Sequence, residues 1–263
     1  EISQWRMNIL KNERSGIVRQ EILTFKTLGL LGDIFRLAMK MQKEGHTLLP
    51  LQLGDPARFD FSPMPSFREG IARAAEKQLS YAYGNPQGYP PLLEKIAGVE
   101  GVDARYVFIG NGVSDMMDKL FNAVAVAGTN VLLPAPVFAP YLDINTKFGV
   151  ESRLYRCDPL TWQPDMADLE SLVDDNTSMI LVNSPNNPTG AVYHREKLEA
   201  VIQLAHETGL ERRKRNIAPP CLILDEIYSE HYYDAPPPDV RPLIEGREFS
   251  WIIFNGASKS MNV

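Results

Sequence analysis

The first fifty residues carry apolar positions at helical spacing. Ile34, Leu37 and Met41 recur three or four residues apart, and Gly45 follows the run. This spacing places the three side chains on one face of a helix, and a glycine is a common end of such an element. We therefore expect residues 1–50 to form an N-terminal arm or a segment of a small domain.

From residue 51 onward, short apolar runs alternate with longer amphipathic stretches. Such alternation is typical of a layered α/β fold, in which the short runs are strands and the stretches between them are helices. Because the runs are apolar on both faces, we expect a mostly parallel sheet flanked by helices in a domain over 51–263. The expected strands are 106–109, 131–133, 151–155, 178–183, 221–225 and 251–255, and the expected helices are 113–126, 138–148, 166–174 and 195–208.

The charge balance argues against a polyanionic partner. Lys and Arg number 27 against 33 Asp and Glu, which gives a net charge of −6. A net negative chain offers little attraction to nucleic acid or to an anionic membrane. The basic cluster at 212–215 is interpreted as a solvated part of an exposed connection over 211–220. Hydrophobic residues make up 44% of the chain, and no run is long enough for a membrane span.

Cysteine and histidine usage indicates neither a disulfide framework nor a metal site. Cys157 and Cys221 lie far apart in the sequence, and the four histidines have no ligand spacing. The N-terminus also lacks the basic, apolar and small-residue regions of a signal peptide. We therefore expect a protein of the reducing cytoplasm without a bound metal.

Residues that could bind a ligand or take part in a reaction follow four of the expected strands. They are the glycine turn 110–114, the proline and asparagine loop 184–190, the carboxylate Asp225 and the amine Lys259. Taken singly, each has an ordinary interpretation as a turn, a loop, a helix N-cap or a surface lysine. Ligands of open α/β sheets, however, bind beyond the carboxyl ends of the strands, where all four would gather.

Together these groups are the parts that hold a phosphorylated pyridine aldehyde. Backbone N–H groups at a helix start suit a phosphate. A lysine supplies the amine for a Schiff base, and a carboxylate keeps the ring nitrogen protonated. The set therefore predicts a pyridoxal 5'-phosphate (PLP) site.

Six ordered motifs resemble those of class I/II aminotransferases of PLP fold type I, in the branch of alanine and tyrosine aminotransferase-like proteins. They are Leu53-Gly54-Asp55-Pro56, the stretch 83–88, Pro134-Ala135-Pro136-Val137-Phe138, Asn183-Ser184-Pro185-Asn186-Asn187-Pro188-Thr189-Gly190, Asp225-Glu226-Ile227-Tyr228 and Ser258-Lys259. The resemblance runs from about residue 51 to the end of the chain. It implies a transaminase that works by a ping-pong route through pyridoxamine phosphate.

The resemblance also implies the catalytic residues. Lys259 would form the Schiff base and then move a proton between the substrate Cα and the cofactor. Asp225 would pair with the pyridinium nitrogen. Asn187 and Tyr228 would hydrogen-bond the ring oxygen, which lowers the pKa of the Schiff base.

Further binding residues are implied in the same way. Val113 and Ser114 would bind the phosphate, Phe138 would stack on the ring, and Ser258 belongs to the cofactor site beside the lysine. The substrate would meet Gly54 and Asn187, and the bond between Asn187 and Pro188 is expected to be cis. Tyr83 would reach the phosphate of a neighbouring subunit, so we expect a homodimer with shared sites.

The sequence departs from the family pattern in two places. Gly256 stands where many members carry a phosphate-binding serine, and the arginines that members carry beyond the lysine have no counterpart before Val263. We therefore expect the large domain to be incomplete at its C-terminal end. Two alternatives to transamination remain at this point: another PLP reaction such as a β-lyase, and a non-catalytic fold type I chain.

Overall fold

The computed structural model describes residues 29–49 and 61–260. The chain divides into two compact units, Glu1–Asp55 and Pro56–Val263, and each is treated by itself. The described helix of the first unit is α3 (Gly29–Lys43), which contains the three apolar positions expected to share a helix. The assignment of 1–50 to an arm or small domain stays a prediction.

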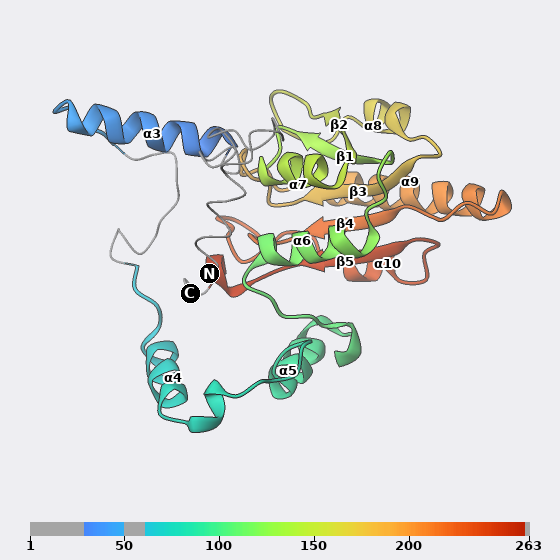
Figure 1. The fold of residues 1–263 in the computed structure, drawn as a ribbon. Coiled ribbons are helices and arrows are strands. Elements are labelled where there is room, and N and C mark those ends of the chain that lie inside the picture. The colour runs from blue at the N-terminus through green and yellow to red at the C-terminus, as the bar shows by residue number, and fades with distance from the viewer. Residues whose placement is uncertain (1–28, 50–60, 261–263) are drawn as a thin grey trace, which may run out of the picture. The chain divides into compact units, whose positions relative to one another are not determined.

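The second unit holds the sheet (Figure 1). Its described elements, in chain order, are α4 (Pro65–Ala75), η3 (Gln78–Tyr81), α5 (Pro90–Glu100), η4 (Ala104–Tyr106), α6 (Val113–Val124), β1 (Asn130–Ala135), α7 (Pro140–Phe148), β2 (Glu151–Arg156), α8 (Met166–Leu172), β3 (Thr177–Asn183), α9 (Arg195–Lys214), β4 (Cys221–Asp225), α10 (Arg241–Ile244), β5 (Ser250–Phe254) and α11 (Ala257–Ser260).

All five strands run parallel, in the order β2-β1-β3-β4-β5. The expected parallel α/β fold is thus confirmed, and five of the six expected strands are present. Parallel strands need helical crossovers, which cover both faces of the sheet. Figure 1 shows α6 and α7 on one face and α8, α9 and α10 on the other.

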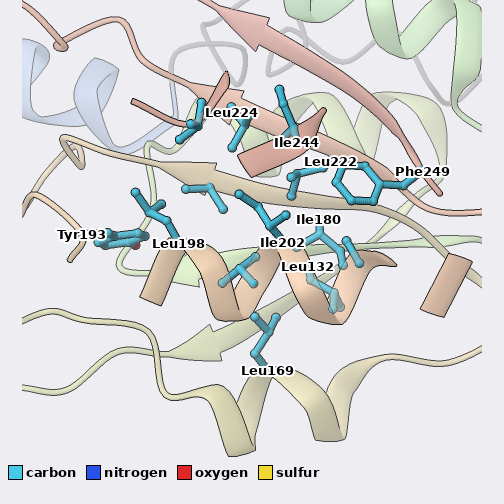
Figure 2. Packing of buried hydrophobic residues seen from close by; sticks show 14 of the residues in the cluster. Leu132, Leu169, Ile180, Tyr193, Leu198, Ile202, Leu222, Leu224, Ile244 and Phe249 are labelled. Carbon is cyan, nitrogen blue, oxygen red and sulfur yellow. The ribbon is translucent and has the colours of Figure 1, made fainter. Parts of the chain in front are cut away.

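Alternate strand residues fill two separate cores, as the two-residue period of a strand requires. On one face, Leu133 and Leu181 pack with Phe121 of α6 and with Ile144 of α7. On the other, residues such as Leu132, Ile180 and Leu222 pack against Leu198 and Ile202 of α9 (Figure 2). Each of the three central strands is therefore anchored from both sides.

The prediction of a strand over 106–109 is wrong. Ala104–Tyr106 is a short 3-10 helix, and residues 107–109 belong to no strand. The side chain of Gln87 takes the place of a neighbouring strand: its Nε2 donates to the carbonyl oxygens of Ala104 (3.0 Å), Arg105 (3.0 Å) and Val107 (2.7 Å). An amide that satisfies backbone acceptors in this way cannot be seen in an apolar run.

The exposed connection expected over 211–220 is also partly wrong. Helix α9 continues to Lys214, and Arg212 is buried, with 3% of its surface exposed. Its Nη1 donates to the carbonyl oxygens of Thr177 (2.6 Å) and Ala218 (3.2 Å). Arg212 is thus a structural clamp between α9 and the start of β3, because otherwise unpaired carbonyl groups there need a donor.

Three findings concern membrane spans, metal ligands and cysteines. No helix within 29–49 and 61–260 is both long and apolar enough to span a membrane. In the same ranges no group of three or more histidine, cysteine or acidic side chains is arranged to hold a metal ion. Cys157 and Cys221 are both free.

Candidate active site

Three strands end at the same level of the sheet. Asn183 at the end of β3 pairs with Asp225 at the end of β4, and Asp225 pairs with Phe254 at the end of β5. Asp225 itself and the segments that carry Asn187, Tyr228 and Lys259 therefore lie after the carboxyl ends of these strands, along one side of the sheet. This is the edge at which open α/β sheets bind ligands.

Asp225 is a buried carboxylate with two hydrogen-bond donors. Only 4% of the surface of this residue is exposed. Oδ2 accepts from the Tyr141 hydroxyl at 3.1 Å, and Oδ1 accepts from the Ile227 N–H at 3.2 Å. Burial raises the pKa of Asp225 to about 6, although both hydrogen bonds act in the opposite direction.

No basic side chain of the described residues forms an ion pair with Asp225. A buried carboxylate without a cation is costly, since burial penalises its charged form. A protonated pyridine nitrogen would provide the missing charge and return the pKa of Asp225 towards its ordinary value. The residues at this edge therefore fit the ring of PLP.

Tyr141 is a further candidate residue of the site that none of the six motifs contains. It lies on α7 and is fully buried, and burial raises the pKa of its hydroxyl well above the ordinary value. The hydroxyl therefore stays protonated and donates to Asp225. A buried tyrosine needs a partner for its hydroxyl, so a tyrosine on the apolar face of the expected 138–148 helix was the available signal.

The loop after β3 is fixed by the asparagine that precedes it. Asn183 Oδ1 accepts from the Asn187 N–H at 2.7 Å, while Asn183 Nδ2 donates to the Asp225 carbonyl at 3.2 Å. The bonds from Ser184 to Pro185 and from Asn187 to Pro188 are both cis, and the second confirms the expectation. Asn183 thus connects the loop to β4, a role that its place in the motif did not reveal.

Asn187 and Tyr228 are brought together. Burial raises the pKa of Tyr228, as does the charge of Asp225, whereas the nearby Asn187 side chain lowers it. The Tyr228 ring also packs edge-on against His231, with ring centroids 6.0 Å apart. Two polar groups expected to face one ring oxygen therefore lie within reach of each other.

Phe138 lies beside Tyr141 rather than alone. The two rings meet edge to face, with centroids 6.4 Å apart and an interplanar angle of 80°. Since Tyr141 in turn donates to Asp225, the aromatic group and the carboxylate belong to one connected cluster. This cluster spans α7 and the end of β4.

Helix α6 begins with a glycine turn, as expected. Gly112 precedes it with φ +81°, a conformation that favours glycine, and gives the helix no side-chain cap. Val113 and Ser114 are the first two residues of α6, where backbone N–H groups have no acceptor inside the helix. The helix start thus offers donors to an anion.

Lys259 lies on α11, shortly after β5, and is half-buried, whereas its neighbour Ser258 is exposed. Gly256, the departure from the family pattern, packs against Ile227: a Cβ at this glycine would lie 3.1 Å from Ile227 Cδ1. A serine there would press on the residue whose N–H holds Asp225. The glycine therefore has a packing reason in this chain.

Two expected site residues are not joined to the others. Tyr83 is fully exposed. Gly54 lies outside the described residues. The roles given to both, like those of the other site residues, remain predictions.

Comparison with known proteins gives a consistent result. A family model described as aminotransferase class I and II matches residues 47–263. The alanine aminotransferase of Mycobacterium tuberculosis is 32% identical over 245 residues, which cover 88% of this chain and 53% of that protein. The glutamate-pyruvate aminotransferase AlaA of Escherichia coli (strain K12) is 28% identical over 238 residues, which cover 88% of this chain and 56% of that protein.

Solved structures agree with these sequence relatives. Alanine aminotransferase from Pyrococcus furiosus matches with a TM-score of 0.74 and 29% identity, over 86% of this chain and 56% of that one. A double mutant of Thermus thermophilus aspartate aminotransferase matches with a TM-score of 0.74 and 27% identity, over 88% of this chain and 58% of that one. The chain thus spans about half the length of the curated relatives it matches.

Proposed function

This chain belongs to the aminotransferase class I and II family, and from that premise we propose that the protein transfers an amino group between an amino acid and a 2-oxo acid. The family depends on PLP. We propose a ping-pong order, in which the amino acid leaves as a 2-oxo acid before the second substrate binds. The observation that carries this proposal is Asp225, a buried carboxylate that pairs with no basic side chain among the described residues.

The chain's own residues divide the work of holding the cofactor. Asp225 would bind the ring nitrogen, Asn187 and Tyr228 the ring oxygen, and Phe138 one face of the ring. The N–H groups of Val113 and Ser114, with the Ser114 hydroxyl, would bind the phosphate; Ser258 completes the set beside the lysine. When bound, PLP supplies the electron sink that a carbanion at the substrate Cα needs.

Two groups act on protons. The Lys259 amine would form the covalent attachment to the cofactor. Once displaced by a substrate amine, it would take a proton from the substrate Cα and deliver it to the cofactor. Asp225 would keep a proton on the ring nitrogen by its charge, because a buried carboxylate interacts strongly with an adjacent cation. The hydrogen bond from Tyr141 supports that charged form.

We also propose that the protein works as a homodimer in the cytoplasm. Full exposure of Tyr83 supports an intermolecular role, in which its hydroxyl reaches the phosphate held by the neighbouring subunit. Gly54 would lie near the substrate carboxylate, where the lack of a side chain allows close approach. The substrate contacts of Asn187 belong to the same proposal.

A half-reaction tests the proposed chemistry. The purified protein, loaded with PLP, is mixed with alanine in the absence of any 2-oxo acid. We expect one equivalent of pyruvate per bound cofactor, no free ammonia, and renewed turnover when 2-oxoglutarate is added. Continuous release of pyruvate and ammonia from a β-substituted amino acid without an acceptor would instead indicate a lyase. A folded protein that binds no PLP would contradict both reactions.

A further inference from the structure

The turn before α6 is held by a carboxylate of the helix itself. Asp115 Oδ2 accepts from the Asn111 N–H at 2.9 Å. Gly110 packs beneath this contact, because a Cβ there would lie 2.6 Å from Asp115 Oδ2 and 2.5 Å from Met116 Sδ. The path of the chain over 110–112 therefore depends on the position of the Asp115 carboxylate.

This carboxylate creates an electrostatic conflict. Hydrogen bonds from Lys119 and Asn111 hold the pKa of Asp115 below its ordinary value, so the group is ionised at neutral pH. It lies in the first turn of α6, where the helix dipole favours negative charge. The phosphate proposed to bind at Val113 and Ser114 is drawn to the same helix end and carries nearly two negative charges. An unpaired Asp115 would oppose its binding.

Lys119 resolves the conflict. Its Nζ pairs with Asp115 Oδ1 from one helical turn further along α6. The two side chains are 57% and 29% exposed, so the pair itself contributes little to stability. Its consequence should therefore appear in the affinity for an anion at the helix start rather than in the free energy of unfolding.

We propose that Asp115 is a positioning residue for the phosphate-binding turn, and that Lys119 neutralises it so that the turn can accept a phosphate. The inference rests on the proposed function, in particular on the phosphate of PLP binding at Val113 and Ser114. It adds two residues that belong to none of the six motifs. Neither is proposed to touch the cofactor.

Affinities for PLP and for pyridoxal, which lacks the phosphate, separate this role from a general structural one. Both ligands are titrated by equilibrium dialysis into the wild-type protein and its variants. Lys119→Met should weaken PLP binding by roughly fivefold and leave pyridoxal binding unchanged, since only the phosphate meets the unpaired charge. Lys147→Met is the matched control: Lys147 is also 57% exposed and pairs with Asp118 of α6, outside the first turn.

Variants of Asp115 test the positioning role. Asp115→Asn keeps an acceptor for the Asn111 N–H without the charge, so PLP should bind at least as tightly as to the wild type. In that background, Lys119→Met should have no further effect. Asp115→Ala removes the acceptor and should weaken PLP binding although it also removes a negative charge. Gly110→Ala should act in the same direction, because its Cβ displaces the carboxylate.

Three results would overturn the inference. In the first, Lys119→Met weakens the binding of PLP and of pyridoxal equally. In the second, Lys119→Met weakens PLP binding as much in the Asp115→Asn protein as in the wild type. Either result would show that Lys119 does not act by neutralising Asp115. Asp115→Ala that binds PLP as tightly as Asp115→Asn would remove the positioning role. A wild-type protein that binds neither ligand would instead refute the proposed function, so the two failures are distinguishable.

Discussion

The two ends of the candidate site are built in different ways. At one end, Asp225 is 4% exposed and held by the Tyr141 hydroxyl and the Ile227 N–H, between strands packed on both faces. At the other end, Lys259 is partly exposed on the four-residue helix α11, and no ion pair of the described chain involves its amine. The chain alone thus fixes the carboxylate but leaves the lysine with few constraints.

This difference teaches which part of the chemistry is preorganised. The interaction proposed between Asp225 and the ring nitrogen would have to persist through the whole reaction, so a carboxylate fixed by the core suits it. A lysine that forms a covalent bond, leaves it and then moves a proton needs freedom at its Nζ. Full burial of Asp225 and only partial burial of Lys259 therefore match the different tasks proposed for the two residues.

Loss of the lysine gives the largest expected effect. Lys259→Ala should abolish covalent attachment of PLP completely, because no other amine is proposed to reach the cofactor, while noncovalent binding persists. Borohydride reduction followed by peptide mass mapping measures the attachment. Lys95→Ala, which removes an exposed lysine of α5, serves as the control and should keep the label. A labelled peptide in the Lys259→Ala protein would refute the assignment.

Replacement of the buried Asp225 carboxylate gives the next largest effect. Its effect on the free energy of unfolding depends on pH. The pKa of Asp225 is raised from 3.8 to about 6, so the folded chain holds a proton that the unfolded chain releases within this window. This contribution to stability is present below about pH 4 and lost as the pH rises through 6. The cofactor-free Asp225→Asn protein should therefore be more stable than the wild type at neutral pH, by about 3 kcal/mol at most, and not at acidic pH.

Denaturant unfolding of the cofactor-free proteins across this pH range measures the effect. Asp175→Asn is an informative control, because Arg215 holds the pKa of the exposed Asp175 below its ordinary value, so its loss should not stabilise the chain at neutral pH. With PLP present, Asp225→Asn should lose nearly all transamination. An Asp225→Asn protein with most of its activity, or with unchanged stability at neutral pH, would contradict the role of the buried charge.

The positions of the candidate site residues at both ends can be predicted from the sequence, because they depend on local apolar runs. Asp225 and Lys259 could be predicted as site residues because each follows an apolar run, and the end of a parallel strand is a recognisable position. The motif with Asn187 was found in the same way. The parallel sheet follows from the same runs, since strands buried on both faces leave a continuous apolar signal.

The missed features depend on contacts between distant segments. Tyr141 and Asn183 act through partners in β4, which lie 84 and 42 residues away along the chain. Gln87 replaces a strand by hydrogen bonds to residues 17 to 20 positions later, and Arg212 is buried by carbonyl groups around β3. Periodicity describes one segment at a time, so it cannot reveal hydrogen bonds of this kind.

A single hydroxyl sharpens the comparison at the buried end. Tyr141→Phe removes a donor from Asp225, and the pKa of Asp225 should rise above 6, by up to about one unit. The pH at which stability is lost should move upward by the same amount in denaturant unfolding. Tyr193→Phe is the control, since the Tyr193 hydroxyl contacts Cys157 Sγ at 3.9 Å instead. An identical pH profile for Tyr141→Phe and the wild type would show that the hydroxyl does not support the charge.

The smallest effect on PLP binding is expected from a change at the fully exposed Tyr83, and this effect depends on dimer formation. Tyr83 is fully exposed in the single chain, so Tyr83→Phe should leave the PLP affinity of a monomer unchanged. In a dimer, the loss of one hydrogen bond to the phosphate should weaken PLP binding by roughly fivefold. Affinities are measured below and above the dimerisation concentration found by sedimentation, with Tyr233→Phe as the equally exposed control. An effect of Tyr83→Phe in the monomer would place this hydroxyl in its own subunit's site and end the proposal of a shared one.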